Sequence, residues 1–146
     1  ADVLWYAQDR FKPSGMIDLA TLTGAMIIAL GHENAGVFGN DDKLAADFIK
    51  SAGAEGEGAW QLPMGQAYDD QLKSRIADMK NVGGRPAGSI TAAQFLKRFV
   101  KDDVPWCHLD IAGVALQSKD TTLAPKGATG WGVMALNRLI ADRYEG

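Results

Sequence analysis

The sequence has only one cysteine and two histidines among its 146 residues. The single cysteine, Cys107, excludes an internal disulfide and fits a reducing compartment. Two histidines, His32 and His108, are too few for a His-Glu-x-x-His motif, and no Cys-x-x-Cys or Gly-x-Ser-x-Gly motif is present. The obvious short motifs of enzymes are therefore absent.

Runs of like charge and long apolar segments are also missing. Fifteen basic and eighteen acidic residues give a net charge of −3, and no cluster of Lys or Arg indicates nucleic-acid binding. The longest strongly apolar stretch, around residues 25–30, is too short to span a bilayer, and no signal peptide follows Ala1. We therefore expect a cytoplasmic protein with neither a nucleic-acid nor a membrane partner.

The chain does contain short apolar runs that alternate with amphipathic segments, and 47% of it is hydrophobic. Residues 15–24 and 106–113 are apolar on both faces, which predicts two buried strands, and residues 35–39 predict a third. Strands that alternate with helices indicate an α/β domain with a mainly parallel or mixed sheet and helices on both faces. No internal domain boundary is apparent.

Helical spacing of apolar residues and capping residues predict the helices. They cover residues 1–11, 24–30, 41–52, a polar segment around 68–76, 89–100 and 130–144. Ser89 is expected to cap the fifth helix. In the last helix, Val133, Leu136, Leu139 and Ile140 are expected to face inward. Residues 53–58 and 114–127 are expected to be loops, and residues 78–84 a strand or turn.

Two aspartates, Asp18 and Asp110, are embedded in the predicted apolar strands. A buried carboxylate must be paired or hydrogen-bonded, and two carboxylates alone are too few for a two-metal hydrolytic site. We interpret both as structural, satisfied by backbone amides or an arginine. His108 is interpreted as a hydrogen-bonded structural imidazole, and its neighbour Cys107 points to the opposite face of the strand, which excludes a Cys-His dyad.

Small residues close both apolar strands, in Thr21-Leu22-Thr23-Gly24 and in Asp110-Ile-Ala-Gly113. Ligands bind at the carboxyl ends of strands in open α/β sheets, where small residues leave room for a substrate. Close packing of strand on helix selects the same residues, and the spacing alone does not decide between the two. Residues 83–89 resemble an anion cradle only in outline, so a tight turn is preferred there.

Four segments occur together in one order: Ile17-Asp-Leu-Ala-Thr-Leu-Thr-Gly-Ala25, Asn81-Val-Gly83, Ala87-Gly-Ser-Ile-Thr-Ala-Ala-Gln-Phe-Leu96 and Trp106-Cys-His-Leu-Asp-Ile-Ala-Gly113. In sequence and spacing they resemble the cytosolic leucyl aminopeptidases, which are hexameric exopeptidases with two metal ions. The resemblance implies peptide substrates, a homo-oligomer, and two divalent metal ions, manganese or zinc. In that family the ions polarise the scissile carbonyl and activate a water molecule.

The family's metal ligands and catalytic side chains belong to an acidic motif, and to a lysine before it, that this sequence lacks. Ala1 resembles the start of the helix that follows the motif. The resemblance therefore implies that residues 1–146 are the C-terminal portion of the catalytic domain. Catalytic residues and metal ligands are then expected upstream of Ala1, and none within this chain.

The resemblance also implies the substrate-contacting positions of this chain. Leu22 would offer its backbone carbonyl to the substrate, Val82 would lie on the leaving-group side, and Ala115 is small where the family can carry a Met-like residue. The expected substrate-binding residues are Thr21, Leu22, Thr23, Gly24, Val82, Ala112 and Ala115. Two alternatives stay open: a non-catalytic scaffold or binding domain that keeps the fold without metals, and a nucleotide-binding domain that uses residues 83–89.

Overall fold

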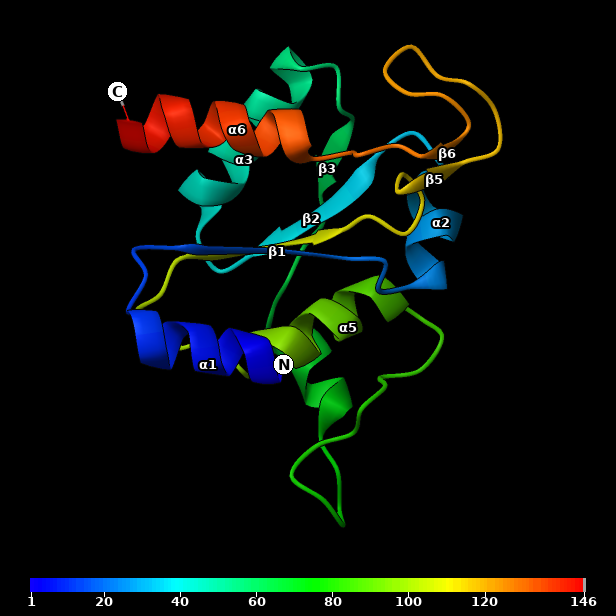
Figure 1. The fold of residues 1–146 in the computed structure, drawn as a ribbon. Helices are drawn as coiled ribbons and strands as arrows, with labels where there is room; N and C mark the ends of the chain where they lie inside the picture. Colours follow the sequence, from blue (N-terminus) through cyan, green and yellow to red (C-terminus); the bar gives the residue numbers. More distant parts are fainter. Residues whose placement is uncertain (146) are drawn as a thin grey trace.

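A four-stranded mixed sheet forms the centre of the fold (Figure 1). The structure is a computed structural model, and it describes residues 1–145. The strands are β1 (Met16–Ala20), β2 (Ala35–Gly39), β3 (Ala59–Gln61) and β4 (Trp106–Asp110), in the order β1-β4-β2-β3. β1 is parallel to β4 and β2 is parallel to β3, whereas β2 and β4 are antiparallel. The predicted α/β class with a mixed sheet is confirmed.

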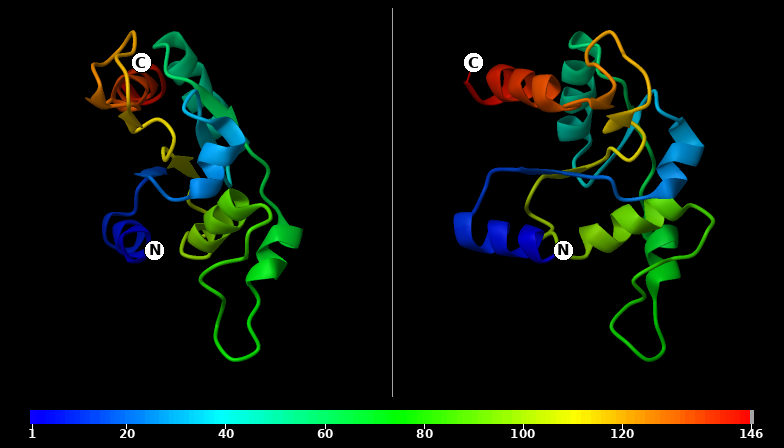
Figure 2. Two further views of the ribbon diagram at one scale, coloured as in Figure 1. Left: turned by 90° about the vertical axis from the view of Figure 1, so that its right-hand side faces the viewer. Right: turned by 45° about the vertical axis from the view of Figure 1, so that its right-hand side comes forward.

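Helices cover both faces of this sheet, as predicted. They are α1 (Asp2–Phe11), α2 (Gly24–Leu30), α3 (Asp42–Ala54), α4 (Gln66–Asp69), α5 (Gly88–Lys97) and α6 (Val133–Ile140), with a 3₁₀ turn η1 (Asp70–Leu72) and a π-helical turn η2 (Ala141–Glu145). Figure 1 shows α3 and α6 on one face and α1 and α5 on the other, and the rotated views of Figure 2 show the same layers. A short ribbon of β5 (Leu116–Gln117) and β6 (Gly127–Ala128) closes the long polar loop. No helix in the described part of the chain is long and apolar enough to cross a membrane.

β4 is the strand around which the core is built, because all five of its residues are buried. Cys107 and Leu109 join the apolar cluster formed with α3 and α6, and burial raises the pKa of the Cys107 thiol to about 12. Trp106 belongs to a second cluster, with α1 and α5, and its ring stacks on His108. The prediction that Cys107 and His108 face opposite sides of the strand is confirmed.

β1 was expected to be buried on both faces, and this expectation is wrong. Within residues 1–145, β1 pairs only with β4 and forms one edge of the sheet. Leu19 is 36% exposed and only Met16 is buried in this strand. The apolar run that predicted two buried faces describes the central strand β4 correctly and the edge strand β1 incorrectly.

Three predicted helix features also differ from the structure. The polar helix ends with η1 at Leu72, so Ile76 is 98% exposed and residues 78–84 form no strand. Ala87, with a φ of 51°, turns the chain so that α5 begins before Ser89, which lies buried in the first turn and does not cap the helix. In α6, Leu139 is buried and Leu136 packs against the core, as predicted, whereas Val133 and Ile140 are exposed and Ala135 is buried.

Candidate functional site

The carboxyl ends of β1 and β4 meet at one edge of the sheet. Ala20 is the last residue of β1, its register partner Asp110 is the last of β4, and the Ile111 amide donates to the Ala20 carbonyl at 2.9 Å. The segment Thr21–Gly24 leaves β1 at this edge and enters α2 (Figure 1). The edge that the sequence predicted for ligand binding is therefore assembled from β1 and β4.

The carboxylate of Asp110, at the end of β4, holds the segment Thr21–Gly24 in place through hydrogen bonds. Asp110 is fully buried and accepts hydrogen bonds from the Leu22 amide at 3.1 Å, the Ala112 amide at 3.2 Å and the Thr23 hydroxyl at 2.7 Å. The Thr23 hydroxyl in turn accepts from the Met26 amide at 3.1 Å and so caps α2. The structural interpretation of Asp110 is confirmed, and one carboxylate orients both Leu22 and the start of α2.

Asp18 has a structural role with different partners from those predicted. Its Oδ2 accepts from the Trp106 indole N–H at 2.7 Å, and its Oδ1 lies 2.7 Å from His108 Nδ1. The His108 ring is fully buried and stacks between Phe38 and Trp106. His108 is therefore the structural imidazole that the sequence indicated, and Asp18 is satisfied by two aromatic side chains and not by an arginine.

A cavity of about 440 Å³ opens where α2, the start of α5 and the loop before α5 meet. Its walls include Leu22, Thr23, Ile28, Val82, Arg85 and Thr91. Most of the lining residues are apolar or glycine, and Arg85 is the only charged one. This volume falls in the range of small-molecule and short-peptide sites.

The structure brings three of the seven expected substrate-binding residues together around this cavity. They are Leu22 and Thr23 on one wall and Val82 on the loop. Thr21 and Gly24 flank the lining residues and are exposed. Ala112 packs behind α2 against the cluster of Met26 and Phe38.

Ala115 lies further away, at the base of the β5–β6 ribbon. Its amide donates to the Ile111 carbonyl at 3.0 Å and its carbonyl accepts from the Thr129 amide at 3.1 Å. Ala115 is thus held by the turn that follows β4 and by the segment after β6, and it does not line the cavity.

Arg85 and Ile28 are cavity residues that sequence reasoning missed. Ala25 and Ile28 are three positions apart on α2 and so share one helix face, a spacing that could have placed them beside Leu22. Arg85 stands in the segment interpreted only as a tight turn. Its position in the wall depends on how that turn packs, which the local sequence does not reveal.

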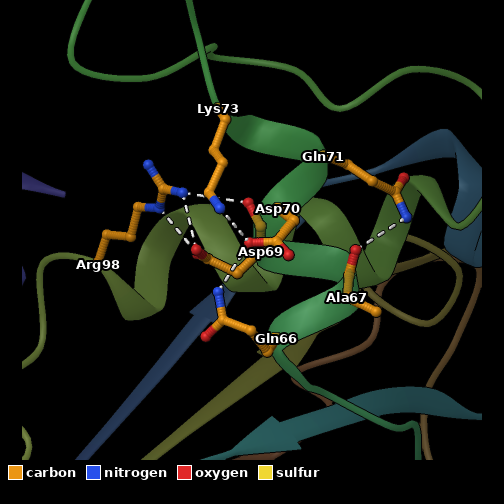
Figure 3. A network of polar contacts seen from close by, with 7 residues as sticks. All are labelled: Gln66, Ala67, Asp69, Asp70, Gln71, Lys73 and Arg98. Carbon is orange, nitrogen blue, oxygen red and sulfur yellow. Dashed lines mark hydrogen bonds and ion pairs between the residues drawn. The ribbon is translucent and has the colours of Figure 1, made fainter.

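A polar network connects the segment before the loop that carries Val82 and Arg85 to the C-terminal end of α5. Figure 3 shows Arg98, at the end of α5, reaching Asp69 of α4 with its Nε and Nη2, each at 2.8 Å from a carboxylate oxygen. The hydrogen bond from Arg98 holds the pKa of the Asp69 carboxyl below its usual value. Lys73 pairs with Asp70 at 2.8 Å just before the loop begins. The segment that leads into the loop is thereby tied to the helix that follows the loop.

Gly83 lets the middle of this loop approach α5 closely. A Cβ at Gly83 would lie 2.6 Å from Thr91 Cβ, so any larger residue must displace the loop. We expect Gly83→Ala to cost about 1–3 kcal/mol of unfolding free energy through overpacking. The displaced loop should also raise the KM of any substrate that uses the cavity. Chemical denaturation and steady-state kinetics measure the two effects.

Gly53→Ala is the matched control, because nothing lies within 4 Å of a Cβ at this helical position. It should be neutral, or stabilising by up to about 1 kcal/mol. A Gly83→Ala variant as stable as the Gly53→Ala variant would contradict the close approach of the loop to Thr91.

The described residues do not form a metal site. Nowhere in residues 1–145 do three or more His, Cys, Asp or Glu side chains gather so that they could hold a metal ion. The buried carboxylate of Asp110 and the partly exposed carboxylate of Asp18 already accept hydrogen bonds from neighbouring groups. No step of a reaction is therefore assigned to a metal ion held by these residues.

Comparison with known proteins identifies the family. The model of the cytosol aminopeptidase family, catalytic domain, matches residues 1–137. The chain belongs to this family. A probable cytosol aminopeptidase of Dinoroseobacter shibae is 73% identical over the whole chain, and one of Caulobacter vibrioides is 60% identical. The chain spans about 30% of the length of these relatives.

Two solved structures of longer chains share the fold of this chain. A tomato leucine aminopeptidase mutant superposes with a TM-score of 0.90 at 42% identity, over 97% of this chain and 27% of that one. A bottromycin maturation enzyme superposes with a TM-score of 0.93 at 37% identity, over all of this chain and 32% of that one. The resemblance to the leucyl aminopeptidases that the sequence motifs carried is confirmed.

Proposed function

We propose that the protein containing this chain is a metal-dependent aminopeptidase that releases N-terminal amino acids, with a leucine-type preference, from peptides. The observation that carries the proposal is the match of residues 1–137 to the catalytic domain of the cytosol aminopeptidase family. In this proposal residues 1–146 are the C-terminal portion of that domain and supply walls of the substrate pocket.

The site at the ends of β1 and β4 supports this role. Asp110 holds the Leu22 amide, and the Leu22 backbone carbonyl would then face the substrate and accept from its amine or peptide N–H. Val82, across the cavity, would contact the leaving-group side. Thr21, Thr23 and Gly24 would complete the loop around the substrate, and Ala112 and Ala115 would shape the room for its N-terminal side chain.

Two divalent metal ions, manganese or zinc, are part of the proposal, and residues other than those described would hold them. When bound, such ions polarise the scissile carbonyl and activate the attacking water. The residues of this chain would bind and orient the peptide. We also propose that the protein acts in the cytoplasm, which fits the names of its cytosol aminopeptidase relatives. The resemblance to the family adds the proposal that it is a homo-oligomer, a hexamer.

The test is hydrolysis of leucine p-nitroanilide by the full translation product that contains these residues, with added manganese or zinc. We expect release of p-nitroaniline that a chelator abolishes. N-acetyl-leucine p-nitroanilide is the matched control, because an exopeptidase that requires a free amine leaves it intact. Equal hydrolysis of both substrates, or of neither, would contradict the proposal, and the second result would favour the non-catalytic binding domain.

A further inference from the structure

Arg85 is the only charged residue among those that line the cavity beside Leu22. Its neighbours in the wall include Leu22, Ile28 and Val82, and no acidic residue lines the same space. Arg98, Arg138 and Arg143 each pair with a carboxylate at 2.8 Å or less. Arg85, like Arg10 and Arg75, takes part in no ion pair within residues 1–145. Arg85 is exposed and contributes the only charge to the lining of a mostly apolar cavity, and no residue of that lining supplies a counter-charge.

The backbone around Arg85 is restrained on both sides. Gly84 has a φ of +108°, which few side chains tolerate, and Pro86 fixes its own φ through its ring. Gly83 lies close to Thr91, and the segment before the loop is joined to the C-terminal end of α5 through Asp69 and Arg98. Little conformational entropy of the backbone is therefore left to lose when Arg85 binds a ligand.

We infer that Arg85 binds a carboxylate on the leaving-group side of the substrate, so that this cavity favours peptides with an anionic group directly after the scissile bond. Two sources supply that group: the C-terminal carboxylate of a dipeptide, and an acidic side chain at the second residue of a longer peptide. An arginine fork matches a carboxylate with two parallel hydrogen bonds. The inference rests on the proposed aminopeptidase activity.

The dimensions of the site agree with this assignment. Leu22 and Val82 both line a cavity of about 440 Å³, which is large enough for a few peptide groups. One residue of extended chain advances by about 3.3–3.6 Å. The inference places a carboxylate one residue beyond a bond held near Leu22 in the cavity that Leu22 and Arg85 both line.

The experiment compares substrates that differ only in this charge, with the full translation product. Leu-Gly against Leu-Gly-amide tests the C-terminal carboxylate, and Leu-Glu-amide against Leu-Gln-amide tests the acidic side chain. We expect kcat/KM to favour the anionic member of at least one pair by about tenfold. Added salt should reduce this ratio, because exposed charges are screened.

Arg85→Gln should bring the ratio close to one, and Arg85→Glu should invert it. Arg75→Gln is the matched control: Arg75 is an exposed arginine of the same loop that lines no cavity, so the ratio should stay at the wild-type value. A wild-type ratio near one in both pairs, or an unchanged ratio in Arg85→Gln, would overturn the inference.

A second readout separates this inference from the proposed function. Calorimetric binding of Leu-Gly and Leu-Gly-amide, measured with the chelator that stops hydrolysis, gives the carboxylate preference without turnover. If no peptide is hydrolysed, the aminopeptidase proposal fails, and equal binding of the two peptides then overturns the role of Arg85 as well. Tighter binding of Leu-Gly that is lost in Arg85→Gln supports the carboxylate site whatever the outcome of the hydrolysis assay.

Discussion

Asp110→Ala is expected to lower the free energy of unfolding by about 3 kcal/mol and to abolish peptide hydrolysis. The substitution leaves the Leu22 amide, the Ala112 amide and the Thr23 hydroxyl without their buried acceptor. The segment Thr21–Gly24 then loses its only carboxylate anchor at the end of β4. Chemical denaturation of the full translation product and the leucine p-nitroanilide assay measure the two losses.

Substitutions at Thr23 test the hydrogen bond to Asp110 separately from the loss of the Asp110 side chain. Thr23→Ser keeps the hydroxyl that bonds Asp110 and caps α2, and it should stay close to wild type in both measurements. Thr23→Val removes that hydroxyl with little change of shape, and should cost about 1–2 kcal/mol. An Asp110→Ala protein with wild-type stability would show that the carboxylate does not hold the segment.

Glu57→Ala is expected to destabilise the fold by about 2–4 kcal/mol. Glu57 is only 3% exposed, and its two carboxylate oxygens accept from the Gly132 amide at 2.8 Å and the Ala135 amide at 2.9 Å. These are among the first amides of α6, which otherwise lack partners, and a negative charge is favoured at a helix N-terminus. Without the carboxylate, α6 should lose its fixed position against α3, which chemical denaturation detects as a lower midpoint.

Glu55 provides the matched control for this prediction. It lies two residues before Glu57 and also contacts α6, but through an ion pair with Arg138 on the more exposed side. Glu55→Ala should cost less than about 1 kcal/mol, as partly exposed ion pairs do. Equal losses in the two variants would contradict the assignment of Glu57 as the buried cap of α6.

The sequence predicts the parts of the fold that local chemistry determines. The sequence predicts Asn40 or Asp41 as the cap of α3, and Asp41 accepts from the Leu44 amide. Gly31 ends α2, and the apolar run of β4 is buried throughout. The errors fall where distant segments decide the outcome. Burial of β1 depends on what pairs with its second edge, and the start of α5 depends on the turn at Ala87, which no local pattern of capping residues reveals.

The same distinction between local sequence and distant contacts explains which residues of the candidate site could be predicted. Leu22 and Thr23 could be predicted because they end an apolar strand, and Val82 because its motif resembles a family. Arg85 could not, since its place in the wall is set by the contact of Gly83 with Thr91. The role of Glu57 at the start of α6 could not be predicted for a similar reason. It lies in a glycine-rich loop whose sequence is typical of a solvent-exposed segment, and only the turn at Gly56, with a φ of +72°, directs it inward.

The pairing of β1 with β4 has a consequence for how the chain folds. Asp18 and His108, which join the two strands, are 90 positions apart in the sequence, whereas β2 and β3 are linked by α3 alone. Contacts between distant positions close a long loop and form slowly, so the β2–α3–β3 unit should become protected first. In pulsed hydrogen exchange, the Val37 and Leu62 amides should therefore gain protection before those of Leu22 and Ala112. The substrate edge would then form late in refolding, and early intermediates would contain the β2–α3–β3 unit without the site.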